Sequence, residues 1–167
     1  MNKRNIILIG MPGAGKSSVG VILAKVLGYE FIDTDLVIQH REKRLLREII
    51  ADEGNEGFLA IENEVNATLE ANKSVIAPGG SAIYGREAME HFKEIGTIVY
   101  LKLSYEDLAK RLGNLKGRGV VLKEGQTLKD LYDERSKLYE QYAEITVDES
   151  GRDIQGTILA LREQIGM

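Results

Sequence analysis

The sequence contains no cysteine, and this absence excludes disulfide bonds and thiolate chemistry. Histidine is also scarce, and His40 and His91 both stand in polar helical surroundings that do not indicate a metal site. A basic excess is missing as well, because 22 basic residues face 26 acidic ones and the net charge is −4. Nothing in this balance offsets the repulsion of a phosphate backbone, so we expect no nucleic-acid partner.

Long apolar runs are absent too. The N-terminal stretch "MNKRNIILIG" begins with basic residues, but its apolar run of about five residues is too short for a signal peptide or a membrane span. We therefore expect a cytoplasmic protein with no membrane partner. We also expect a monomer. The length of 167 residues suits a single domain over 1–167 with a substantial core.

Short apolar runs alternate with helical patterns along the chain. The predicted strands are 5–10, 29–33, 74–80, 97–103 and 145–148. The predicted helices are 16–28, 36–53, 55–71, 85–96, 104–113, 127–144 and 153–165. Gly28 and Ser104 are candidate caps, and Gly54 separates two of the helices. This alternation predicts an α/β fold, a three-layer sandwich with helices on both faces of a five-stranded parallel sheet.

One glycine-rich stretch has the pattern of a phosphate-binding loop. The sequence "GMPGAGKS" (10–17) fits G-x-x-x-x-G-K-[ST] and stands between a predicted strand and a predicted helix. Its glycines allow backbone N–H groups to curl around phosphate oxygens, and the helix N-terminus adds partial positive charge. Lys16 can reach the β- and γ-phosphates of a nucleotide, and Ser17 can ligate Mg²⁺. The alternative, a glycine turn that contains a lysine by chance, does not account for this context.

Two other nucleotide-binding signals are missing. The strand 97–103 ends without Asp or Glu, so it offers no second carboxylate to a magnesium ion. A guanine-reading N-K-x-D motif does not occur either, because "NKSV" (72–75) lacks the aspartate. The pattern therefore argues against a GTPase. In a compact α/β sheet the nearest carboxylates to the loop are those at the end of the second strand.

Two aspartates, Asp33 and Asp35, end that strand in "YEFIDTD". In an extended segment, residues two apart point to the same side, so both carboxylates are expected in the cleft at the carboxyl ends of the strands. Phosphoryl transfer needs one acid beside Mg²⁺ and another at the accepting hydroxyl, and we assign these roles to Asp33 and Asp35 respectively. The alternative is an Asx turn that caps the next helix, with Thr34 or Asp35 as the N-cap.

Three arginines follow in places suited to an anionic ligand. Arg118 lies in "NLKGRGVVLKEGQ" (114–126), a glycine-containing segment that we interpret as a mobile lid. Arg135 lies on the following predicted helix, where it can fork onto a carboxylate. Arg152, in "DESGRD", is a loop arginine that could lie over an adenine. Solvated surface positions are the alternative for all three.

In their order along the chain, these segments resemble one family, the shikimate kinases. The stretch "GMPGAGKSSVG" resembles the family's P-loop, and "FIDTD" resembles its aspartate pair. The stretches "APGGS", "GRGVVL" and "ERSKLYEQYA" resemble its glycine triplet, its lid-arginine segment and its substrate-arginine helix. The first two motifs are shared with other small kinases, whereas the full order is more specific.

The resemblance implies a P-loop core like that of nucleoside monophosphate kinases, with a mobile lid at about 114–126. It implies transfer of the ATP γ-phosphate to the 3-hydroxyl of shikimate, a small-molecule partner. The ATP-binding residues that it implies are Gly13, Ala14, Gly15, Lys16, Ser17, Ser18, Arg118 and Arg152, with Ser17 and Asp33 at Mg²⁺. The implied substrate-binding residues are Asp35, Gly79, Gly80 and Arg135, and the implied catalytic residues are Lys16, Asp35 and Arg118.

The chain departs from the family pattern at four positions. Leu59 stands where the family usually has an arginine that shares the substrate carboxylate with the helix arginine. Ser81 replaces the third glycine of the triplet, and Gly119 replaces a proline after the lid arginine. The family also has an earlier lid arginine, and its place falls near Asn114 in this chain. Leu59 matters most, because loss of a charged partner weakens a buried carboxylate site.

Two other functions stay open at this point. One is a related kinase of another polyol or hydroxy acid, resembling gluconate kinases, and Leu59 and Ser81 favour it. The other is a nucleotide-binding module that no longer transfers phosphate, and the intact Lys16, Ser17, Asp33, Asp35 and Arg118 argue against it.

Overall fold

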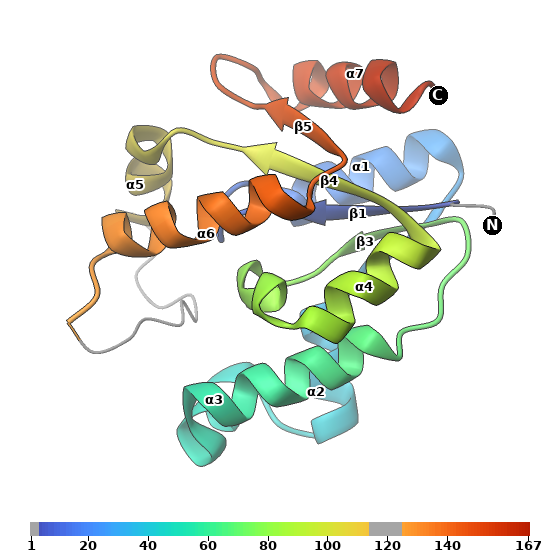
Figure 1. Ribbon diagram of the computed structural model, residues 1–167. Helices are drawn as coiled ribbons and strands as arrows, with labels where there is room; N and C mark the ends of the chain where they lie inside the picture. The colour runs from blue at the N-terminus through green and yellow to red at the C-terminus, as the bar shows by residue number, and fades with distance from the viewer. Residues whose placement is uncertain (1–3, 114–124) are drawn as a thin grey trace.

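The computed structural model describes residues 4–113 and 125–167, and it contains a five-stranded sheet in the order β2-β3-β1-β4-β5 (Figure 1). The strands are β1 (Asn5–Ile9), β2 (Glu30–Asp33), β3 (Ser74–Ala77), β4 (Gly96–Lys102) and β5 (Ile145–Asp148). Every neighbouring pair is parallel. The predicted five-stranded parallel sheet is confirmed, and its central strand β1 leads directly into the glycine loop.

Seven α-helices and one 3₁₀ helix are described around the sheet. The α-helices are α1 (Lys16–Leu27), α2 (Thr34–Glu42), α3 (Leu46–Ala67), α4 (Arg86–Ile95), α5 (Tyr105–Gly113), α6 (Leu128–Tyr142) and α7 (Ile154–Ile165). The 3₁₀ helix η1 (Gly80–Tyr84) follows β3. Among the described residues, no helix is both long enough and apolar enough to cross a membrane.

Strand β1 shows why the sheet is covered on both faces. Ile7 and Ile9 belong to a buried cluster with side chains of α4, α5 and α6. Ile6 and Leu8, which point the other way, belong to a second cluster with side chains of α1 and α7. Successive residues of a strand face opposite sides, so an uninterrupted apolar run requires a layer of helices on each side. The predicted three-layer sandwich is therefore present.

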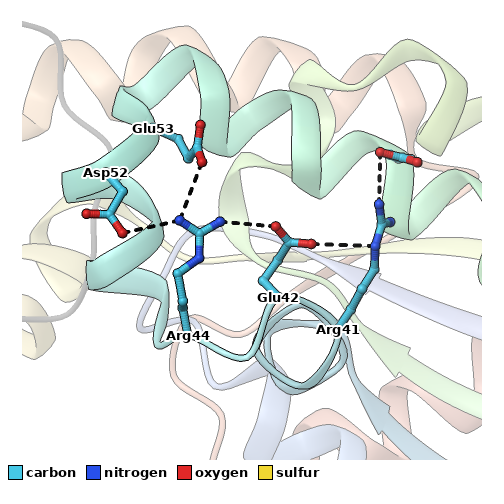
Figure 2. Close-up of polar contacts among 6 residues, drawn as sticks. Arg41, Glu42, Arg44, Asp52 and Glu53 are labelled. Carbon is cyan, nitrogen blue, oxygen red and sulfur yellow. Dashed lines mark hydrogen bonds and ion pairs between the residues drawn. The ribbon is translucent and has the colours of Figure 1, made fainter.

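Helices α2 and α3 pack on each other on the side of β3 that faces away from β4 and β5 (Figure 1). Their buried contact is a separate small cluster of Ile38, Ile49, Phe58 and Val65. On its surface, Arg44 forms ion pairs with Glu42, Asp52 and Glu53 (Figure 2). Arg44 thus links the end of α2 to the first part of α3.

Some predicted boundaries were wrong. The predicted helix 36–53 is divided between two helices, since α2 ends at Glu42 and α3 begins at Leu46. Helix α2 also begins earlier than predicted, at Thr34. This break has no glycine or proline signal, and short-range side-chain contacts hold it: Leu46 N donates to Gln39 Oε1 at 3.0 Å, and Arg44 pairs on both sides. The expected interruption at Gly54 exists as a kink with φ 74° and ψ 177° inside α3.

The predicted strand 74–80 was too long. Strand β3 ends at Ala77, and the chain then turns into the unpredicted η1, so Gly79 and Gly80 lie at the start of a 3₁₀ helix rather than in a strand. The expected caps were correct. Gly28 ends α1 in the left-handed region, with φ 71°, and the Ser104 hydroxyl accepts a hydrogen bond from Asp107 N at 3.3 Å.

Candidate active site

The glycine loop joins β1 to α1, and the sheet places it at the carboxyl edge of the central strand. Gly13 and Gly15 have φ values of 89° and 82°, which other residues rarely adopt, so the loop needs glycine at both points. Gly15 immediately precedes the first residue of α1. The loop therefore points the free N–H groups and the positive end of the helix dipole at one place, an arrangement that suits phosphate.

Lys16 lies inside this loop. Its Nζ donates hydrogen bonds to the carbonyl oxygens of Gly10 at 2.6 Å and Met11 at 3.1 Å. Burial lowers the pKa of Lys16 to about 8, and the negative charge of Asp35 opposes the shift. Phosphate groups nearby would favour the charged ammonium in the same way, so the side chain is suited to neutralise a polyphosphate.

A cavity of about 720 Å³ opens beside the loop, and most of the predicted site residues line it. Those that do are Gly13, Gly15, Lys16, Ser17, Ser18, Asp33, Asp35, Gly79, Gly80 and Arg135. Two do not: Ala14 is buried within the loop, and Arg152 is exposed in the turn between β5 and α7. Arg118 lies outside the described residues, as does the predicted lid apart from Gly125 and Gln126.

Both aspartates line the cavity, but Asp35 does so from a helix and not from an extended strand as predicted. Asp33 is the last residue of β2 and the N-cap of α2, and its Oδ1 accepts a hydrogen bond from Asp35 N at 2.9 Å. Asp35 lies in the first turn of the helix, so the extended-strand argument was wrong for it. A helix cap is present as the alternative expected, but the N-cap is Asp33 and not Thr34 or Asp35, and Asp33 lines the cavity as well.

Asp35 is an unusual carboxyl group. Burial, and next the negative charge of Asp33, raise its pKa to about 6, and Lys16 opposes the shift. A carboxyl group with a pKa below but near neutrality is mostly ionised at pH 7 and basic enough to accept a proton. This combination suits a residue that takes the proton of an attacking hydroxyl.

Arg135 forms the opposite wall. Its side chain is only 1% exposed on α6, and its guanidinium lies 5.5 Å from the centre of the Tyr84 ring. A Cβ on Gly80 would lie 3.0 Å from Arg135 Nη1 and 2.7 Å from Pro12 Cδ, so only glycine leaves room there. Tyr139 holds this glycine by donating to its carbonyl oxygen at 2.7 Å. A buried planar guanidinium beside a cavity suits a carboxylate ligand.

Glu62 and Ser81 line the same cavity, and the contact between these two residues was not predicted from the sequence. Ser81 Oγ donates a hydrogen bond to Glu62 Oε1 at 2.7 Å. Burial raises the pKa of Glu62 to about 8, and the hydrogen bond from Ser81 opposes the shift. One signal was available: Glu62 falls four residues after Phe58, on the apolar stripe of its helix, where an acidic residue is out of place.

Arg111 and Glu149 were also missed. Arg111, in the last turn of α5, lines the cavity and donates from Nη1 to the Gly13 carbonyl oxygen at 3.0 Å. Glu149 is 5% exposed next to the strand end of β5, and burial raises its pKa to about 7, against the positive charge of Arg111. The family's earlier lid arginine, which was expected near Asn114 and is not there, thus has a candidate counterpart three residues earlier in Arg111.

Leu59 does not line the cavity. It is partly buried against the cluster between α2 and α3, so α3 contributes Phe58 and Glu62 to the wall instead. Arg44 does not substitute for the missing arginine, because Glu42, Asp52 and Glu53 hold it on the outer surface (Figure 2). Among the described residues, the basic side chains that line the cavity are Lys16, Arg111 and Arg135.

Comparison with known proteins agrees with this geometry. The sequence profile of the family described as shikimate kinase matches residues 12–165. The chain belongs to the shikimate kinase family. It is therefore an ATP-dependent phosphotransferase with a hydroxyl group as the acceptor, as expected for the family. The alternative of a nucleotide-binding module without transfer activity is not supported.

Relatives in the shikimate kinase family match over most of their length. The shikimate kinase of Chlorobium phaeovibrioides is 35% identical over 171 aligned positions, covering 96% of this chain and 86% of that protein. Shikimate kinase 2 of Yersinia enterocolitica is 34% identical over 154 positions, covering 87% of this chain and 86% of that protein. The solved shikimate kinase of Acinetobacter baumannii, in complex with shikimate, is 34% identical with a TM-score of 0.80, covering 98% of this chain and 91% of that one.

Proposed function

We propose that this enzyme transfers the γ-phosphate of ATP to the 3-hydroxyl of shikimate. The observation that supports this most directly is the meeting of Asp35 and Arg135 in the cavity beside the phosphate loop. One offers a base for a hydroxyl group, and the other offers a forked donor for a carboxylate. Shikimate has both groups, and a relative at 34% identity was solved with shikimate bound.

The nucleotide would bind at the loop end of the cavity. Backbone N–H groups of Gly13, Gly15 and the start of α1 would hold the phosphates, and Lys16 would neutralise the transferring group. Arg111 is close enough to the loop to add a second positive charge, since it already contacts Gly13. Arg118 is proposed for the same task from its sequence position alone.

The residues present fit a magnesium ion of the kind that ATP brings with it. Ser17 and Asp33 both line the cavity, and Mg²⁺ is usually held by one or two protein oxygens together with phosphates and water. No group of three His, Cys, Asp or Glu side chains gathers for a metal within residues 4–113 and 125–167. When bound, Mg²⁺ would neutralise charge that develops on the phosphates during transfer.

At the acceptor end, Asp35 would orient the accepting hydroxyl and take its proton as the oxygen attacks the γ-phosphorus. Arg135 would hold the carboxylate on the other side of the ring. Two fixed ends orient the acceptor, so that one hydroxyl is brought to the phosphate. Gly80 lets the acceptor approach Arg135 closely, because a side chain there would fill that space.

A related kinase of another small hydroxy acid or polyol remains a second candidate. The observation that favours it is the wall formed by Leu46 and Phe58, together with Leu59 in place of a second cation. Such a site offers fewer positive charges to bind a carboxylate, and it presents more apolar surface to the acceptor. Shikimate would then be a poor substrate, and a different ring or chain would fit better.

The test is ATP consumption with and without shikimate, followed by a panel of hydroxy acids and neutral polyols at equal concentration. Phosphorus NMR of the product identifies the phosphorylated hydroxyl. We expect shikimate-dependent turnover and a 3-phosphate ester. No turnover with shikimate up to its solubility limit, combined with turnover of another acceptor, would replace the first candidate with the second. Lys16→Ala provides the background rate.

A further inference from the structure

Glu62 is a buried acid at the acceptor end of the cavity, and the roles proposed above leave it without a task. Its side chain is 1% exposed, and its Oε1 accepts the hydrogen bond from Ser81. Its Oε2 has no hydrogen-bond partner, although it is shielded from solvent. An ionised carboxylate in this position would bury a negative charge with only one hydrogen bond, which costs more than burying the neutral acid.

Gly79 brings Glu62 close to Asp35. A Cβ built on this glycine would lie 2.9 Å from Asp35 Oδ1 and 3.1 Å from Glu62 Oε2. The two carboxyl groups thus approach the same small volume, which only a glycine leaves open. Two carboxylates so close to each other repel, so one ionises before the other.

The charged groups facing Glu62 come from three helices. Asp35 on α2 disfavours its ionised form, while Arg135 on α6 and Lys16 on α1 favour it. Ser81 on η1 also favours the ionised form through its hydrogen bond. Burial outweighs these contributions and raises the pKa of Glu62 to about 8. Near neutrality Glu62 is therefore the protonated, uncharged acid of this end of the cavity.

We propose that Glu62 is a positioning residue that adapts the site to an acceptor bearing a carboxylate. In this role Glu62 is protonated, and therefore uncharged, while the carboxylate of the acceptor is bound to Arg135. This inference rests on the acceptor site described under the proposed function. An ionised Glu62 would repel the incoming carboxylate and compete with it for the Arg135 guanidinium. A neutral Glu62 leaves that charge to the acceptor, which matters here because Leu59 supplies no second cation.

The proposal predicts a particular pH dependence. The KM for a carboxylate-bearing acceptor should be constant below pH 8 and rise above it, by at most tenfold per pH unit, since one proton is involved. A neutral polyol that the enzyme accepts should show no such rise. Loss of the Lys16 proton in the same range would affect both kinds of acceptor equally, so comparing the two removes that contribution.

Two variants separate this role from a merely structural one. Glu62→Gln keeps the size and the contact with Ser81 but has no proton to lose, so its KM should be within about threefold of wild type at pH 7 and flat up to pH 9. Ser81→Ala removes a bond that favours the ionised form, so the rise in KM should move to higher pH. Glu64→Gln, on the exposed face of the same helix, is the matched control and should behave like wild type.

Isothermal titration calorimetry provides a second readout. Shikimate binding to wild type at pH 8.5, in two buffers of different ionisation enthalpy, should show proton uptake that Glu62→Gln lacks. A KM that rises equally in wild type and Glu62→Gln, or binding without proton uptake, would overturn the proposal. If shikimate is not turned over, the proposed acceptor is wrong, and the best carboxylate acceptor of the panel takes its place. A panel that yields only neutral acceptors would overturn this inference as well.

Discussion

Arg111 donates a hydrogen bond from Nη1 to the Gly13 carbonyl oxygen at 3.0 Å, which ties the end of α5 to the phosphate loop. We expect Arg111→Ala to raise the KM for ATP about tenfold, since a contact to a charged group contributes about 1.5–3 kcal/mol and this side chain is partly screened by solvent. Lys110→Ala, its exposed neighbour, should leave the KM unchanged. Initial rates at varied ATP decide this, and equal values for both variants would contradict the assignment.

Lys16→Ala should abolish phosphoryl transfer while the fold stays intact. The ammonium contributes charge at the transferring phosphate, and losing such a contact costs about a hundredfold or more in rate. ATP turnover and circular dichroism measure the two effects. Lys25→Ala, on the exposed side of the same helix, is the control. Retention of more than about a tenth of the wild-type rate would be incompatible with this role.

Asp35→Asn and Asp33→Asn should differ in their kinetics. Asp35 is proposed to act on the acceptor hydroxyl, so its variant should lower kcat by about a hundredfold or more with little change in the KM for ATP. Asp33 is proposed to support Mg²⁺, so its variant should raise the magnesium concentration needed for half-maximal rate. Titrations of Mg²⁺ and acceptor on both variants test this. Identical profiles would show that the two roles are not divided in this way.

The stability of the free protein should fall between about pH 5 and pH 8. Burial raises the folded-state pKa of Glu62 from 4.5 to about 8, so the folded state binds more protons than the unfolded state across this range. Unfolding free energy then decreases as pH rises, and the loss is complete above the folded pKa. Ionisation of Glu149 adds to this decrease in unfolding free energy up to about pH 7. Deprotonation of Lys16 has the opposite effect and increases the unfolding free energy between about pH 8 and pH 10.5.

Glu62→Gln should reduce that decrease, because an amide does not ionise. Thermal unfolding at pH 5 and pH 8 measures it, and the difference in Tm should be several degrees smaller in the variant than in wild type. The exposed Glu64→Gln should retain the full difference. A variant whose Tm changes with pH as much as that of wild type would mean that Glu62 is ionised in the folded protein over this range.

Leu59→Arg should lower the KM for shikimate by roughly tenfold, if its guanidinium reaches around Phe58 to share the carboxylate with Arg135. Leu59→Gln is the control, because it removes the same apolar contact with the α2–α3 cluster without adding charge. Shikimate titrations of both variants and wild type distinguish the outcomes. A KM that rises in Leu59→Arg as much as in Leu59→Gln would contradict this prediction and show that position 59 does not reach the acceptor.

Much of the fold followed from local patterns. Alternating apolar runs and helical stretches predicted the parallel sheet and its two covering layers, because an apolar strand in a parallel sheet must be buried on both faces. The glycine loop was recognisable because its lysine and serine must stand at set positions after the glycines to reach the same phosphates. Asp33 and Asp35 were found because acids beside a phosphate loop suit phosphoryl transfer, whereas Arg135 was assigned through the resemblance of its helix to that of the shikimate kinases.

Other features depended on residues distant in sequence. The break between α2 and α3 is an exception, because short-range contacts of Arg44 and Gln39 hold it, although no glycine or proline marks it. Arg111 stands 98 residues from the Gly13 oxygen that it contacts, and Glu62 stands 19 residues from its partner Ser81. Such pairs meet only after the helices pack on the sheet, so no spacing rule of a single helix or strand reveals them.

The sequence by itself determined the layer architecture, the phosphate loop and the class of chemistry, because each depends on residue types at short, regular spacing. The tertiary structure alone decided which carboxyl groups are charged. Asp35 and Glu62 belong to the same residue class and come from different helices, but burial and their approach across Gly79 separate their pKa values to about 6 and about 8. That separation arises from desolvation and from charge repulsion between packed elements, and neither exists until the chain has folded.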